Sequence, residues 1–283
     1  MSKMPKKNKM RIDQWLVEQG LMPSREKAQA AIMAGLVFVD GQRVEKAGSK
    51  VTTDAAVEIK GESMPYVSRG GLKLEKAIHT FGVSLQGATV LDIGASTGGF
   101  TDCALQHGAR LVYAVDVGYG QLAWKLRQDP RVILFERTNF RYFQAERLTH
   151  GLPDWVTIDV SFISVRLIFP VLANFLPAES HVITLLKPQF EAGRQLVGKK
   201  GIVRDPKVHE HVLTAMIEFS LKSGYDVRDL SFSPITGGDG NIEFLLHLTW
   251  NLKELGSNLL NRQPSEIVSD AHEQLKSKQK EGE

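Results

Sequence analysis

The sequence predicts an α/β protein in which a doubly wound, mostly parallel sheet follows a small α+β unit. Apolar, strand-like segments alternate with helical stretches from about residue 67 onward, which is typical of a parallel sheet covered by helices. One of these segments runs into a glycine-rich turn, and the next ends on an aspartate. The first sixty residues show shorter elements. A chain of 283 residues has room for both parts.

The N-terminal part reads as a basic arm followed by a helix–helix–hairpin unit. Residues 1–10 are polar and are predicted to be a disordered arm, and residues 11–62 form the unit. RIDQWLVEQG has helical periodicity, and Ser24 is placed to cap a second helix that Gly35 ends. LVFVDGQRV then predicts two short strands around an Asp-Gly turn.

A linker of residues 63–66 leads into the sheet domain, residues 67–252, and residues 253–283 form a polar tail that includes a solvated helix. SRGGLKLEKAIHTFG predicts an amphipathic helix before the first strand. The last two strands are expected to form an antiparallel hairpin at the sheet edge. The predicted strands are, in order, ATVLDIG, LVYAVD, RVILF, DWVTIDV, HVITLLK, YDVRDLSFS and IEFLLHLTW.

Charge and composition restrict the classes of function that this protein can have. The net charge is +3, but the first fifty residues hold ten Lys or Arg and five Asp or Glu, which favours a polyanion-binding module. The single cysteine, Cys103, excludes an internal disulfide and is expected to be a core thiol. The longest apolar run, residues 167–176, has half the length of a membrane-spanning helix, and no signal peptide is evident. We expect a cytoplasmic protein without a membrane partner.

The eight histidines show no sequence spacing typical of a metal site, so no metal is predicted. His209 and His211 form an H-x-H pair that we assign to a solvated helix.

The glycine-rich segment LDIGASTGGFTD is the main functional signal. Its glycines allow close backbone approach to a ligand, and Asp116 at the next strand end is the expected acceptor for ribose hydroxyls. This pattern fits S-adenosylmethionine as well as NAD. Asn139 follows the third strand, where adenine contacts usually arise. The predicted cofactor-binding residues are Asp92, Gly94, Ala95, Ser96, Thr97, Gly98, Gly99, Phe100, Asp116 and Asn139.

The N-terminal motifs R-I-D-Q-W-L, S-R-E-K-A and A-G-L-V-F-V-D-G-Q-R-V resemble the RNA-binding domain of the ribosomal protein S4 type. This domain is shared with pseudouridine synthases and bacterial tyrosyl-tRNA synthetases. Basic side chains on one face would contact phosphates, which positions an RNA without specifying its sequence. The predicted RNA-binding residues are Arg11, Arg25, Lys27, Arg43 and, at the start of the second domain, Arg69.

The second half resembles FtsJ-like ribose methyltransferases, and the whole chain resembles the TlyA, or haemolysin A, family of rRNA 2′-O-methyltransferases. The motifs that carry this resemblance are YVSRGGLKL, LDIGASTGGFTD, VDVGYGQL, RTNFR, IDVSFIS, LLKPQFEAGR and GNIEFLL. It implies a Rossmann-like methyltransferase sheet, S-adenosylmethionine as cofactor, and rRNA or a ribosomal subunit as partner, with a cytidine ribose as acceptor. It also implies a catalytic set of Lys73, Asp159, Lys187 and Glu243.

The predicted chemistry assigns each catalytic side chain a role. A ribose hydroxyl is a weak nucleophile at neutral pH, so its methylation requires a base and accurate alignment. Lys187 is the candidate base. The cation of Lys73 and partial desolvation are expected to favour neutral Lys187, while Asp159 and Glu243 orient the two lysines.

Other interpretations stay open at this point. A chain that binds RNA without catalysis would be a ribosome-assembly factor, and the haemolysin label of the family suggests a pore-former. Glu191 and Arg194 would contact RNA or brace a loop, and Ser68, Arg69 and Gly70 form an interdomain joint or a substrate contact. The oligomeric state cannot be read from the sequence.

Overall fold

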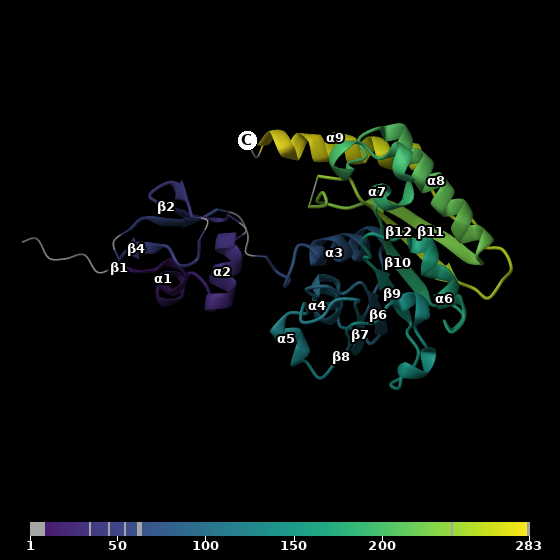
Figure 1. The fold of residues 1–283 in the computed structure, drawn as a ribbon, viewed down its shortest axis with the longest axis horizontal. Helices are drawn as coiled ribbons and strands as arrows, with labels where there is room; N and C mark the ends of the chain where they lie inside the picture. The colour runs from purple at the N-terminus through teal and green to yellow at the C-terminus, as the bar shows by residue number, and fades with distance from the viewer. Residues whose placement is uncertain are drawn as a thin grey trace, which may run out of the picture. The chain divides into compact units, whose positions relative to one another are not determined.

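The computed structural model of the chain divides into two compact units, Met1–Pro65 and Tyr66–Glu283 (Figure 1). The structure describes residues 9–33, 35–44, 46–53, 55–60, 64–238 and 240–281. Most of the predicted basic arm, residues 1–8, lies outside the described residues. Lys9 and Met10 belong instead to a short strand with Arg11, so the unit begins earlier than predicted.

The described residues of the smaller unit form two helices and two small sheets. Its elements are β1 (Lys9–Arg11), α1 (Ile12–Glu18), α2 (Arg25–Met33), β2 (Val37–Val39), β3 (Gln42–Arg43), β4 (Lys50–Thr52) and β5 (Val57–Ile59). Strand β1 pairs with β4, and β2 lies between β3 and β5. The predicted hairpin is present: Asp40 and Gly41 have φ angles of 50° and 77°, as a two-residue turn between twisted strands requires.

Helical periodicity explains the core of this unit. Ser24 caps α2 by accepting a hydrogen bond from the Lys27 backbone N–H at 3.3 Å. Ile12, Leu16, Ala28, Ile32 and Val37 are buried, whereas Val39 is half-buried. Trp15 and Met22 complete the same cluster.

The larger unit contains a seven-stranded sheet. Its strands are β6 (Thr89–Ile93), β7 (Leu111–Val115), β8 (Val132–Phe135), β9 (Trp155–Ile158), β10 (His181–Leu186), β11 (Tyr225–Phe232) and β12 (Phe244–Trp250). Its α-helices are α3 (Gly70–Phe81), α4 (Gly99–Gln106), α5 (Trp124–Arg127), α6 (Phe169–Ala173), α7 (Pro188–Glu191), α8 (Pro206–Lys222) and α9 (Pro264–Glu281). Short 3₁₀ helices are η1 (Phe140–Tyr142), η2 (Ala145–Arg147), η3 (Val165–Leu167), η4 (Arg194–Leu196) and η5 (Lys199–Gly201).

The strand order is β11-β12-β10-β9-β6-β7-β8, and β10, β9, β6, β7 and β8 run parallel. This confirms the predicted doubly wound sheet. The chain leaves β6 toward β7 and β8 and returns on the other side through β9, so a topological switch point lies between β6 and β9. The final pair is antiparallel as predicted, but β12 also pairs with β10, so of these two strands only β11 lies at an edge of the sheet.

Alternation along the strands builds a core on each face of the sheet. In β6, Leu91 and Ile93 join one cluster and Val90 joins the other, because successive side chains in a strand point to opposite faces. The first cluster receives α6, α8 and α9, and the second receives α3, α4 and α5 (Figure 1). Cys103 is fully buried in the second cluster, as predicted, and burial raises the pKa of its thiol to about 12.

The C-terminal segment differs from the predicted solvated tail. Helix α9 has one apolar face, on which Ile267, Val268, Ala271 and Leu275 are buried in the first core cluster. His209, assigned from the sequence to a solvated helix, is also fully buried and contacts His272 of α9 through ring nitrogens 2.9 Å apart. The few apolar residues of this segment are spaced to meet α8, and their burial outweighs the overall polarity.

No helix among the described residues has the length and apolar character needed to cross a membrane.

Candidate active site

The glycine-rich turn lies at the switch point, where β6 meets β9. Gly94 has a φ angle of 87°, and a Cβ there would lie 2.5 Å from the carbonyl oxygen of Asp159. A side chain at this position would therefore push the two strand ends apart. Gly98, with a φ angle of 98°, then starts α4. Glycine at position 94 thus permits the close approach of two strand ends, and its predicted approach to a ligand stays a prediction.

Asp116 closes β7 beside this turn. Its Oδ2 atom accepts a hydrogen bond from the Ser96 backbone N–H at 2.7 Å, and its Oδ1 atom accepts one from Gly118 at 2.7 Å. Each carboxylate oxygen has a second lone pair, so the fixed carboxylate can still accept hydroxyl donors from a ligand.

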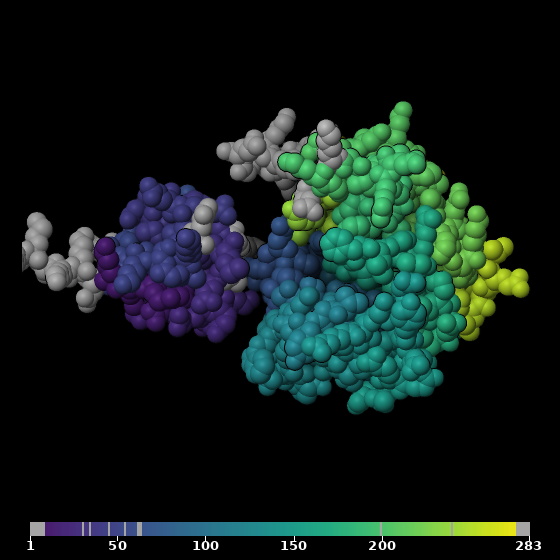
Figure 2. Space-filling view, in the orientation of Figure 1, coloured from purple at the N-terminus to yellow at the C-terminus, as the bar shows by residue number. Residues whose placement is uncertain are grey.

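A cleft with two lobes opens at the carboxyl ends of the parallel strands. The first lobe has a volume of about 630 Å³ and is lined by Lys73, Asp159 and Lys187, among others. The second has about 400 Å³ and is lined by Asp116, Asn139 and Phe140, among others. Both are within the range of small-molecule sites. The lobes share Gly94, Ser96, Asp159 and Ser161, and Figure 2 shows the surface of this unit hollowed between its blue, teal and green segments.

Each lysine of the predicted catalytic set has its own carboxylate partner. Lys73 Nζ, on α3, lies 2.6 Å from Glu243 Oε2, just before β12. Lys187 Nζ, just after β10, lies 2.6 Å from Asp159 Oδ1 and donates a hydrogen bond to Ser161 Oγ at 2.9 Å. The four predicted residues are therefore brought together from four separate segments of the chain.

Burial strengthens the electrostatic interactions among the charged groups of this cluster. The side chain of Glu243 is 3% exposed, and those of Lys73 and Lys187 are 11% and 10% exposed. Burial raises the pKa of Glu243, and the adjacent Lys73 ammonium opposes part of that shift. Charges with so little water around them interact more strongly than they would on the surface.

Asp92 is a predicted cofactor-binding residue whose side chain lies outside both lobes. Its side chain is fully buried under the glycine turn, and neither lobe includes it. Thr101 Oγ1 donates to Oδ2 at 2.6 Å and Thr157 Oγ1 donates to Oδ1 at 2.9 Å. Burial raises the pKa of Asp92 to about 6. Asp92 therefore braces β6 against α4 and β9 instead of lining the cleft.

The remaining predicted cofactor residues are close to the lobes. The first lobe is lined by Gly94, Ala95, Ser96, Thr97, Gly99 and Phe100, and the second by Gly94, Ser96, Asp116 and Asn139. Gly98 lines neither lobe; a Cβ there would meet the side chains of Leu122 and Leu126. Its φ angle and this packing explain why glycine occupies the position.

The predicted RNA-binding residues divide between the two units. Arg11 and Arg25 are half exposed, and both contact Asp13, which is fully buried. Hydrogen bonds from Arg11, Gln29 and Arg25 hold the pKa of Asp13 well below its usual range. Asp13 was not among the residues predicted from the sequence. Its position in the first turn of a helix, two residues after Arg11, could have indicated it.

The other three basic residues have separate environments. Lys27 Nζ donates a hydrogen bond to the Met64 carbonyl oxygen at 3.1 Å, and Arg43 is exposed. Arg69 is exposed and lines the first lobe, where its guanidinium donates to the Thr236 carbonyl oxygen at 3.1 Å. Arg69 thus belongs to the cleft of the larger unit.

The structure adds side chains that the sequence did not single out. Ser161 holds Lys187, and Phe162, which lines the second lobe, is 87% exposed with a φ angle of 66°. The loop of residues 236–238 lines the first lobe. Glu191, for which the sequence left an RNA contact or a bracing role open, accepts hydrogen bonds from the Ser164 hydroxyl at 2.6 Å and the Val165 N–H at 2.8 Å, so it braces a loop. Phe162 lies in the motif IDVSFIS, and an aromatic residue in that motif could have indicated its position at the cleft.

Two family models match the two units. The FtsJ-like methyltransferase model matches residues 66–250, and the S4 domain model matches residues 10–57. The first match covers more than half of the chain. The chain is a member of the TlyA family of FtsJ-like methyltransferases.

Relatives of this TlyA-family protein match over most of their length. The Bacillus subtilis protein YqxC is 58% identical, and the match covers 95% of this chain and 96% of the relative's own length. Hemolysin A of Brachyspira hyodysenteriae is 44% identical, with 84% and 99% covered. The Mycobacterium tuberculosis 16S/23S rRNA (cytidine-2′-O)-methyltransferase TlyA is 41% identical, with 84% and 89% covered. A solved structure from Streptococcus thermophilus, 49% identical, superposes with a TM-score of 0.77 and covers 96% and 98%.

Proposed function

We propose that this protein transfers a methyl group from S-adenosylmethionine to a ribose 2′-hydroxyl of rRNA, that of a cytidine. The observation that carries the proposal is the placement of Lys187, paired with Asp159, at the boundary of the two lobes. A cofactor in the second lobe and a nucleotide in the first would meet there. The relatives that act on cytidine in 16S and 23S rRNA support the choice of acceptor.

The second lobe fits the cofactor. Asp116 presents fixed carboxylate oxygens that can accept ribose hydroxyls, and Gly94 leaves room for the backbone to approach a ligand. Asn139, Phe140 and Ile168 line the same lobe, where they can contact a base. S-adenosylmethionine, when bound, supplies an electrophilic methyl group on its sulfonium.

The protein would contribute a base and alignment. Lys187 Nζ would accept the proton of the 2′-hydroxyl as its oxygen attacks, and Asp159 and Ser161 would hold this nitrogen in position. Lys73, fixed by Glu243, would orient the ribose from the other wall of the first lobe. Accurate alignment of reacting groups can supply about 7–11 kcal/mol of the barrier reduction.

The S4 domain would bind structured rRNA. Its half-exposed Arg11 and Arg25 carry charges that suit phosphate contacts, which add affinity and little sequence preference. The partner under this proposal is rRNA or a ribosomal subunit.

Cofactor binding can be tested separately from the reaction. Asp116→Ala removes the expected acceptor for ribose hydroxyls and should weaken S-adenosylmethionine binding by about 10–150-fold, since a hydrogen bond to a charged group is worth about 1.5–3 kcal/mol. Calorimetric titration of the full chain measures this. Glu146→Ala, at an exposed acidic residue outside both lobes, is the matched control and should bind normally.

The reaction is tested by transfer of labelled methyl groups to separated ribosomal subunits and to free rRNA. We expect label on a ribose, and a loss of about 10²–10⁴-fold in Lys187→Ala, which is the usual range for a general base. Lys207→Ala, at an exposed lysine on α8, should react normally.

The alternative is a ribosome-assembly factor that binds RNA without catalysis. Absence of label despite tight binding of both cofactor and RNA would favour it. Full activity in Lys187→Ala would instead keep the methyltransferase and overturn the choice of base.

A further inference from the structure

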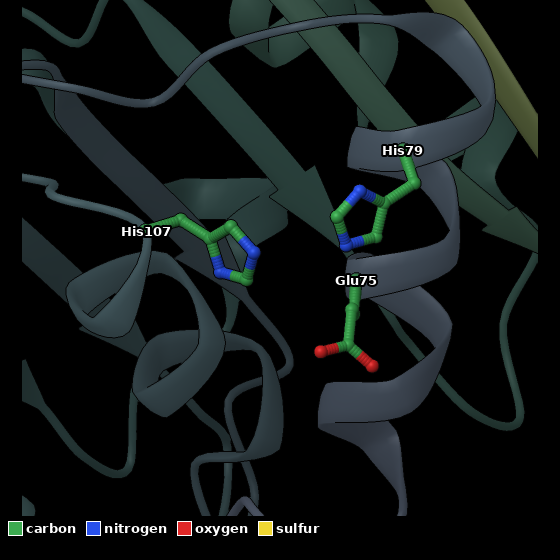
Figure 3. A group of neighbouring side chains, drawn as sticks. All are labelled: Glu75, His79 and His107. Carbon is green, nitrogen blue, oxygen red and sulfur yellow. The ribbon is translucent and has the colours of Figure 1, made fainter.

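A cluster of potential metal ligands lies away from the cleft, between α3 and the end of α4. Glu75 and His79 are one helical turn apart on α3, and His107 follows the last residue of α4 (Figure 3). One ligand atom from each side chain lies within 4.8 Å of the other two. The three side chains point into a common space from two separate helices (Figure 3).

We propose that Glu75, His79 and His107 form a binding site for a divalent transition metal ion, with zinc as the ion that this donor set favours. Two imidazoles and one carboxylate are a common zinc ligand set, and three protein ligands leave a position for water. The exposed side chain of His79 keeps that position open to solvent. This site is independent of the methyltransferase activity.

The distances allow ligation after small side-chain rotations. Zinc binds nitrogen and oxygen ligands at about 2.0–2.2 Å in tetrahedral geometry, so two ligand atoms of one ion lie about 3.3–3.6 Å apart. The three ligand atoms here lie within 4.8 Å of one another, so side-chain rotations have to bring them closer by up to about 1.5 Å. His79 is exposed and can rotate, whereas Glu75 and His107 are half-buried and provide a fixed base.

Neighbouring groups orient two of the ligands. His107 Nδ1 lies 2.9 Å from the Cys103 carbonyl oxygen, which can only accept a hydrogen bond. The proton is therefore on Nδ1, and the lone pair of Nε2 is available to a metal. The Tyr66 hydroxyl donates to Glu75 Oε1 at 2.6 Å, which fixes that carboxylate. Such outer contacts are typical of metal sites, where they set the ligand tautomer and orientation.

Sequence spacing did not reveal this site, because only Glu75 and His79 are close in the chain. His107 joins them because α3 packs against α4 on one face of the sheet. A bound ion would connect the helix that carries Lys73 to the end of the helix that starts at the glycine turn. Occupancy should therefore make this half of the larger unit harder to unfold.

The test uses the full chain, purified without a histidine tag, treated with a chelator and titrated with zinc chloride in a calorimeter. We expect one zinc ion per chain. His79→Ala and His107→Ala should each weaken zinc binding at least tenfold, and Glu75→Gln should also weaken it. His79 is exposed, so its variant should fold normally. Zinc at about 100 times the Kd should raise the Tm by about 5 °C in the wild type and much less in His79→Ala.

His150→Ala is the matched control, since His150 is an exposed histidine outside the cluster. It should bind zinc as the wild type does. Cobalt titration gives a second readout, because a three-ligand site with water produces visible absorption bands that depend on His107. No zinc binding, or equal losses in His79→Ala and His150→Ala, would overturn the proposal.

Discussion

Lys73 and Glu243 are 170 residues apart in the chain, yet Nζ of the lysine lies 2.6 Å from Oε2 of the glutamate. The pair joins α3 to the start of β12 at the wall of the first lobe. Two kinds of variant can distinguish a role of this pair in methyl transfer from its contribution to stability.

Glu243→Gln should leave the Lys73 ammonium without its counter-ion and lower the methyl-transfer rate by about 10²-fold, because small displacements at a reacting centre have effects of this size. The raised pKa of Glu243 means that it takes up a proton at a higher pH than an ordinary carboxyl. The wild-type rate should therefore fall as pH falls toward that pKa, and the Gln variant should lack this acid limb. Single-turnover rates across pH measure both effects.

The double variant Lys73→Leu with Glu243→Leu is a useful companion. Apolar residues often replace a buried ion pair without loss of stability, so urea unfolding should be close to wild type. Methyl transfer should be lost all the same. Retained activity in the double variant would show that the pair has only a structural role.

Asp92 should make the larger unit more stable at mildly acidic pH. Its pKa is about 6 in the folded state, compared with about 3.9 for an ordinary aspartate. The folded state therefore holds a proton that the unfolded state has lost, and the stabilisation that is present below about pH 4 disappears as pH rises through 6. The change is on the order of 3 kcal/mol.

Asp92→Asn removes this titration. The difference in unfolding free energy between wild type and variant, measured in urea at pH 5 and pH 7.5, isolates the effect from other titrating groups. We expect the wild type to lose more stability than the variant between these two pH values. A difference that does not change with pH would contradict the assignment.

Phe162→Ala should lower kcat/KM for RNA by about 5–150-fold. The side chain is 87% exposed at the rim of the second lobe, with its ring 5.3 Å from that of Phe190, so it can stack on a base. Stacking of a base on an aromatic ring is worth about 1–3 kcal/mol. Tyr142→Ala, at an exposed aromatic outside both lobes, is the control.

Asp13→Asn should destabilise the S4 domain and reduce RNA affinity together. The carboxylate accepts hydrogen bonds from Arg11, Arg25 and Gln29, all at 3.0 Å. We expect a loss of about 1–3 kcal/mol, near the lower end because the arginines are half exposed.

The lowered pKa of Asp13 sets the sign of its pH dependence. Its stabilisation is present above the ordinary aspartate range and is lost as pH falls below about 4. Hydrogen exchange of the segments around α1 and α2, compared at pH 6 and pH 3.5, should show this loss in the wild type. The Asn variant should show a smaller change. Equal protection at both pH values in the wild type would contradict the expectation.

Local patterns in the sequence determined much of this protein. All seven sheet strands, the Ser24 cap and the Asp40-Gly41 turn follow from residues that are close together in the chain. The glycine turn and Asp116 indicated the position of the second lobe for the same reason, since a strand, a turn and a helix start are neighbours in the sequence. The roles of the catalytic residues remain predictions.

Tertiary structure decided the features that depend on distant partners. Asp92 is a brace because Thr101 and Thr157 reach its two oxygens, and α9 is buried because α8 and β11 offer it an apolar surface. His107 lies beside His79 only because two helices cover the same face of the sheet. The periodicity of side chains along the sequence indicates which face of a helix or strand is apolar. Which polar groups contact one another depends on how the elements pack together.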